Sequence, residues 1–72
     1  MKQYIAVIGL YNETTTEQIS LKEIVVNATD VYQAHKEALL KCNVQEEHQV
    51  LRLFNANNRN LVFDFKTGFI AR

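Results

Sequence analysis

Hydrophobic positions along this chain fall into strand-like runs separated by polar turns, and the first run is apolar on both of its alternating sides. In the segment 3–11, one side carries Ile5, Val7 and Tyr11, and the other carries Tyr4, Ala6, Ile8 and Leu10. Successive side chains of a strand point to opposite faces of a sheet. One helix can cover one face of a small sheet, so part of the other face is expected to be covered by a partner chain, a ligand or the protein's own C-terminal tail.

Three further segments have the composition of strands, at 19–26, 49–54 and 61–65, and a short edge strand is expected at 69–71. In the second segment the alternation changes phase: Ile19 and Leu21 share one parity, and Ile24 and Val26 share the other. One extra residue in a strand shifts the alternation. The sequence therefore predicts a β-bulge near 22–23. The asparagine-rich segment 55–60 predicts a turn, because asparagine tolerates the left-handed backbone.

The hydrophobic period changes from two to about 3.6 over residues 31–42, which predicts a helix. Asp30 is suited to the N-cap, and Asn43 is a suitable stop. At 100° per residue, one side gathers Val31, Tyr32, Ala34, His35, Ala38, Leu39 and Cys42. Leu40 faces outward.

The predicted order is β-β-α-β-β, which indicates an α+β fold. One helix packs on a largely antiparallel four-stranded sheet, with a short fifth edge strand. A chain of 72 residues forms a single domain, 1–72. Alternation does not decide which side of strand one meets the helix, and the side that carries Ile5 and Val7 is chosen for the expected core. The expected core is Ile5, Val7, Ile24, Val26, Val31, Ala34, Ala38, Leu39, Leu51, Leu53, Leu61, Phe63 and Phe65.

Charge is balanced overall, with eight basic and eight acidic residues, but it is unevenly distributed. Residues 1–47 hold seven acids and four bases, and residues 48–72 hold one acid and four bases. A neutral chain is a poor general polyanion binder, although the basic C-terminal part leaves nucleic-acid binding open as an alternative. No segment has the length of apolar sequence that a membrane span needs, and no secretory signal is recognisable. We therefore expect a cytoplasmic protein.

Few residues in the sequence suggest a catalytic or metal-binding site. His35 lies on the apolar side of the predicted helix, where it is expected to pack rather than to transfer protons. Cys42 and His48 lack the close pairing typical of zinc ligands, and cysteine at a helix C-terminus is disfavoured as a thiolate. The sequence predicts no metal, no cofactor and no catalytic residue.

The segment 26–28, followed by Asp30 and by a helix with Ala34 and Ala38, resembles small bacterial and phage modules. The resemblance implies a strand packed tightly against the helix that follows it. It does not imply a particular function.

The leading functional hypothesis is a small non-catalytic protein-interaction module of phage or mobile-element type that binds itself or another protein. Homodimers are one expected form. The predicted partner-binding residues are Tyr4, Ile8, Leu10, Leu40, Val50 and Phe54. The alternative is a nucleic-acid-binding module that uses Arg52, Arg59, Lys66, Phe69 and Arg72, because rings can stack on bases while cations follow phosphates. A third hypothesis is a small enzyme or ligand binder centred on His35.

We predict that metal chelators leave the melting temperature unchanged. A structural zinc site would contribute about 10 kcal/mol to folding, so its removal could not pass unnoticed. Thermal unfolding with and without a chelator provides the measurement. A clear fall in melting temperature would show that Cys42 and the histidines bind a metal after all.

Overall fold

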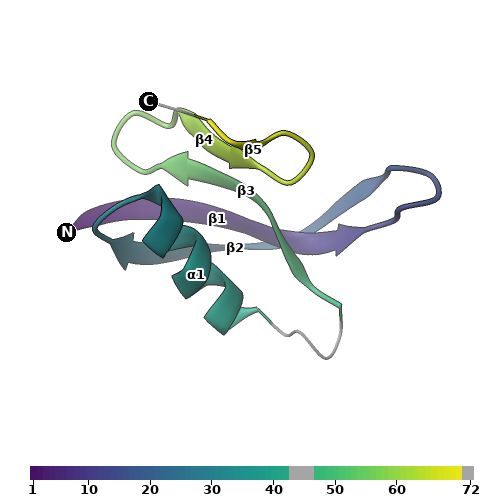
Figure 1. Ribbon diagram of the computed structural model, residues 1–72. Coiled ribbons are helices and arrows are strands. Elements are labelled where there is room, and N and C mark those ends of the chain that lie inside the picture. The colour runs from purple at the N-terminus through teal and green to yellow at the C-terminus, as the bar shows by residue number, and fades with distance from the viewer. Residues whose placement is uncertain (43–46, 71–72) are drawn as a thin grey trace.

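The computed structural model describes residues 1–42 and 47–70, and in these ranges one helix packs on one face of a five-stranded antiparallel sheet (Figure 1). The strands are β1 (Lys2–Tyr11), β2 (Gln18–Ala28), β3 (Gln49–Asn55), β4 (Leu61–Asp64) and β5 (Gly68–Phe69). The helix is α1 (Val31–Lys41). Their order across the sheet is β2-β1-β3-β4-β5. The predicted α+β fold class is confirmed, and the short fifth strand is present.

The helix begins where the sequence indicates. The Asp30 carboxylate accepts a hydrogen bond from the Gln33 N–H at 2.8 Å, and Asp30 has an extended backbone. The Gln33 side-chain oxygen accepts in return from the N–H of Thr29 at 2.7 Å and from its hydroxyl at 2.8 Å. The first bond satisfies a backbone donor that a helix start leaves open, and the other two hold the residue before the cap in place. At the C-terminal end of the helix, the Cys42 N–H donates a hydrogen bond to the Leu39 carbonyl. The predicted stop, Asn43, lies outside the described residues.

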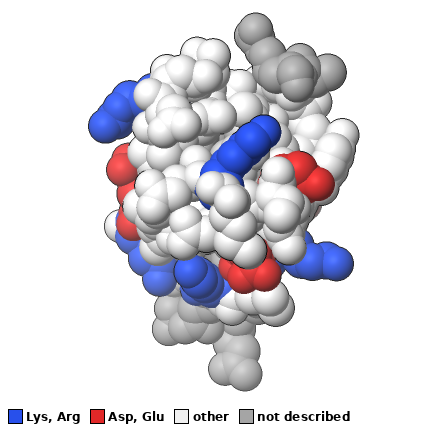
Figure 2. Space-filling view, turned by 90° about the vertical axis from the view of Figure 1, so that its left-hand side faces the viewer, with Lys and Arg blue, Asp and Glu red and all other residues white. Residues whose placement is uncertain are grey.

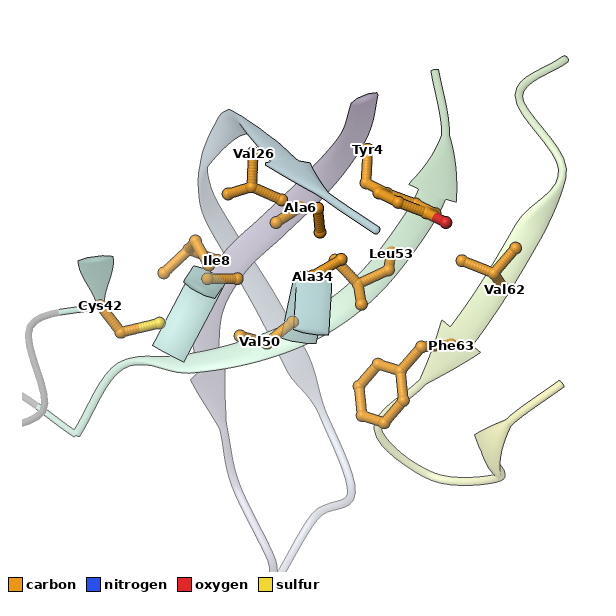
Figure 3. Close-up of a cluster of buried hydrophobic side chains, with 12 residues drawn as sticks. Tyr4, Ala6, Ile8, Val26, Ala34, Cys42, Val50, Leu53, Val62 and Phe63 are labelled. Carbon is orange, nitrogen blue, oxygen red and sulfur yellow. The ribbon is translucent and has the colours of Figure 1, made fainter. Parts of the chain in front are cut away.

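The helix covers the side of β1 opposite to the predicted one. Tyr4, Ala6 and Ile8 are buried in one cluster with Ala34 and Ala38 (Figure 3). The expected core residues Ile5 and Val7 lie on the other side of the strand and outside this cluster. The face assignment was wrong because the two sides of β1 are almost equally apolar. What separates them is size, since Ala6 leaves room for the helix to approach.

The core under the helix also draws on β2, β3 and β4. Its remaining buried members are Val26, Ala28, Cys42, Val50, Leu53, Val62 and Phe63, and Ile24 and Val31 pack against it. Besides Ile5 and Val7, three further residues of the predicted core lie outside this cluster and are not fully buried: Leu39 and Phe65 are exposed, and Leu61 is half-buried. Leu51 is fully buried but does not belong to the cluster under the helix.

Irregular register explains the positions of Val50 and Leu51. Between β1 and β2 the partners pass from Lys22 to Ser20, which leaves Leu21 unpaired, next to the predicted bulge. Between β1 and β3 they pass from Arg52 to Val50, which leaves Leu51 unpaired. Bulges add a residue to one strand and increase the local twist. Val50 and Leu53 can therefore both face the helix although their parities differ.

Gly9 is required by the close approach of β2 at the first of these bulges. A Cβ at this position would overlap the Ile19 carbonyl oxygen and lie 2.9 Å from Leu51 Cδ1. Neither the strand backbone nor the fully buried leucine can move aside easily. Gly68, by contrast, has open space around it and a left-handed backbone with φ of 86°.

We predict that Gly9→Ala lowers the free energy of unfolding by about 3 kcal/mol, because the methyl group must displace backbone. Gly68→Ala is the matched control: its methyl group has open space, so the left-handed backbone strain that alanine introduces should cost only about 1 kcal/mol. Urea unfolding of both variants provides the comparison. Equal losses would contradict the close packing at Gly9.

Candidate functional site

The face of the sheet that α1 leaves uncovered carries a row of apolar side chains that crosses four strands. Register places Val25 of β2 beside Ile5 of β1, Ile5 beside Phe54 of β3, and Phe54 beside Leu61 of β4. Paired residues of neighbouring strands share a face. Val25 is 54 % exposed, and the other three are partly buried. We call this row, together with the charged side chains around it, the helix-free face.

A second row lies directly beside the apolar one, and it is charged at three of its four positions. It runs from Glu23 through Val7 and Arg52 to Asp64. The Arg52 guanidinium crosses β1 and donates to the Gln18 side-chain oxygen and to the Ser20 hydroxyl, both at 3.1 Å. These bonds hold its aliphatic stem against the sheet, and Val7 on the same face is buried. Part of the helix-free face is therefore closed by the protein's own side chains.

The open part of the helix-free face contains a hollow of about 210 Å³. It is lined by Ile5, Phe54, Glu23 and Arg59, so that an apolar floor is flanked by one acid and one base. Arg59 lies in the turn between β3 and β4 and has a left-handed backbone with φ of 60°. Its N–H donates to the Asn55 carbonyl at 2.7 Å. The turn was predicted, but the left-handed residue in it is an arginine rather than an asparagine.

The predicted partner-binding residues separate into three groups. Tyr4, Ile8 and Val50 are buried beneath the helix, so the surface patch they were expected to form does not exist in the folded monomer. Their burial follows from the reversed face of β1. Phe54 does lie on the helix-free face.

Leu10 and Leu40 lie away from the helix-free face. Leu10 shares the helix side of β1 but lies near the far end of the hairpin, in an open hollow of about 700 Å³ with Ile19 and His48. Leu40 points outward from the helix and is 75 % exposed. Leu40 and the uncovered side of β1 therefore do not form one partner-binding surface, because the two lie in opposite layers.

The residues of the nucleic-acid hypothesis do not gather on one surface. Arg52 and Arg59 belong to the helix-free face, whereas Phe69 lies on the helix side, with its ring centroid 4.6 Å from that of Tyr32. Lys66 lies in the turn between β4 and β5, and Arg72 lies outside the described residues. On the end of the molecule shown in Figure 2, basic and acidic side chains are interspersed, so no basic patch is visible there.

His35 lies in an aromatic cluster between α1 and the C-terminal hairpin. Its ring centroid lies 4.5 Å from Phe63 and 5.4 Å from Phe69, and Phe63 and Phe69 are 4.8 Å apart. Burial lowers the pKa of the His35 imidazole below its ordinary value of 6.5. These neighbours are apolar rings rather than acids or nucleophiles, and they give His35 a packing role.

Metal ligation finds no geometric support in residues 1–42 and 47–70, where no cluster of three or more His, Cys, Asp or Glu side chains could hold an ion. Cys42 is buried, and burial raises the pKa of its thiol, with nearby Lys22 acting in the opposite direction. A neutral buried thiol is a packing group.

Comparison with known protein families, curated proteins and solved structures found no match to this chain. Among the described residues there is no helix with the length and apolar character needed to cross a membrane.

We predict that His35 makes the protein less stable as pH falls below about 6.5. Because the pKa of folded His35 is lowered, the unfolded chain binds more protons between that pKa and 6.5, so acidification favours unfolding. Melting temperatures from pH 7.5 to 5.5 measure the effect. His35→Phe, which keeps an aromatic ring, should flatten the dependence in this range, and an unchanged slope would contradict the assignment.

Proposed function

We propose that this protein is a small non-catalytic binding module that docks a protein molecule against the helix-free face of its sheet. The observation that carries the proposal is the apolar row Val25, Ile5, Phe54 and Leu61, which no helix in the described residues covers. Contiguous apolar surface on a small domain is typical of interaction sites, and aromatic side chains such as Phe54 are enriched in their centres.

The surroundings of the row also favour a protein partner. The row is bordered by charges of both signs, Glu23, Asp64 and the two arginines. Protein interfaces have this arrangement of an apolar centre within a polar rim. A cytoplasmic location belongs to the same proposal, and it is supported by the single free cysteine, Cys42.

Nucleic acid is the alternative ligand for the same face, because Arg52 and Arg59 flank Phe54 there. Single-strand binders combine such rings and cations. Against this alternative, the Arg52 guanidinium is already engaged by Gln18 and Ser20, and Glu23 and Asp64 lie in or beside the same rows. The balance of charge on the face favours protein.

We predict that Val25→Glu abolishes capture of the protein partner, because it places a charge at the most exposed position of the apolar row. Leu40→Glu is the matched control: it introduces the same charge at a more exposed leucine on the opposite layer, and capture should persist. Both sites are exposed, so neither variant should change the melting temperature by more than a few degrees. Immobilised native protein and both variants, incubated with lysate of the native host, provide the comparison.

The dependence on Val25 is the decisive result, since capture of an arbitrary protein would carry no weight. Equal capture by native protein and Val25→Glu would contradict the proposal, and loss only in Leu40→Glu would move the site to the helix. Retention of nucleic acid instead of protein would favour the alternative. With only four basic residues in 48–72, that binding should weaken with salt with a logarithmic slope of at most about four.

A further inference from the structure

The helix-free face has charges arranged so that it can complement a copy of itself. Glu23 comes from the edge strand β2, and Arg59 comes from the turn after β3, so the two approach the hollow from different sides. Ile5 and Phe54, which pair directly across β1 and β3, form the floor of the hollow that Glu23 and Arg59 flank. The face thus presents one acid and one base on either side of an apolar centre.

We propose that the protein docked on the helix-free face is a second copy of this chain, related by a two-fold axis. This inference rests on the proposed function. An axis that lies in the plane of the face and passes between Glu23 and Arg59 sets each Glu23 over Arg59 of the other copy. The apolar rows then meet at the centre, and two identical ion pairs flank them. Such an isologous contact is the commonest form of self-association.

The backbone of Arg59 supports a role for its side chain. The left-handed region costs a non-glycine residue about 1 kcal/mol, and glycine or asparagine would fill the position more cheaply. The turn contains asparagines at 57, 58 and 60, yet an arginine occupies the left-handed position. An Arg–Glu contact across an interface gives a reason for this choice.

Size and net charge are also consistent with a dimer. A standard interface buries about 800 Å² on each partner, which is about one sixth of the 4905 Å² surface of the described protein. The formal net charge is zero, so two copies do not repel each other at long range. Small domains that cannot form a disulfide commonly gain stability by association, and this chain has one cysteine.

Sedimentation equilibrium of the full chain, across a concentration series at low salt, tests the proposal. The native protein should dimerise, and Glu23→Arg or Arg59→Glu alone should weaken the dimer about tenfold or more, because each places like charges opposite each other. The double variant Glu23→Arg with Arg59→Glu should recover most of the loss. Recovery identifies the pairing, since two independent surface defects would add.

Arg59→Gly separates association from folding. Glycine relieves the left-handed strain, so the variant should unfold at no lower urea concentration than the native protein when both are dilute enough to be monomeric, while its dimer weakens at higher concentration. A native protein that stays monomeric at the highest concentration overturns the proposal. A dimer that is unaffected by these variants also overturns it, because it would then form through another surface such as the free edge of β2.

The experiments separate loss of the two-fold dimer from loss of the docking face itself. A monomeric native protein whose capture of a different protein still depends on Val25 would overturn the two-fold dimer and leave the docking face intact. A monomeric native protein that captures protein no better than Val25→Glu would overturn both the two-fold dimer and the docking face.

Discussion

The contact between α1 and the sheet is made by alanines, and the rest of the structure is arranged around it. Ala34 and Ala38 on the helix meet a sheet surface that carries Ala6 and Ala28, and all four are fully buried. Small side chains let a helix approach a sheet closely, and the larger members of the core then fill the space on either side. Figure 3 shows this arrangement, with Ala6 and Ala34 near the middle and Tyr4, Ile8, Leu53 and Phe63 around them. Dense packing of this kind leaves little tolerance for added volume.

One short helix seated in this way covers only one face. The opposite side of β1 is as apolar as the side in the core, and the protein closes part of it with Arg52, which lies across β1 towards β2. Tyr11 and Phe65 also pack together, with ring centroids 4.8 Å apart. The C-terminal residues Phe69 and Ile70 line a hollow with Tyr4 and Tyr32 on the helix side, so they do not complete the cover. The row from Val25 to Leu61 is what remains open.

The sequence predicted the elements well because their signals are local. The helix at 31–42 is observed as Val31–Lys41, Asp30 caps it, and the expected phase shift in the second strand corresponds to unpaired Leu21. The face of β1 could not be predicted by alternation, since Ile5 and Val7 are as apolar as Ala6 and Ile8. Matching the small residue Ala6 to Ala34 and Ala38 was the available signal. The apolar row could not be predicted from the sequence either, because it depends on pairing register and on the bulges at Leu21, Leu51 and Val62.

The central claim is that the helix-free face is open in the monomer and covered in a complex. Relaxation of methyl groups by a soluble paramagnetic probe, measured in dilute and in concentrated solution, tests it most directly. Ile8 and Val26 should be protected at both concentrations, since they lie under the helix. Ile5 and Val25 should be accessible when dilute and become protected as copies associate. Accessibility of Ile5 and Val25 that does not change with concentration would contradict coverage by a second copy, and accessibility of Ile8 would contradict the face assignment itself.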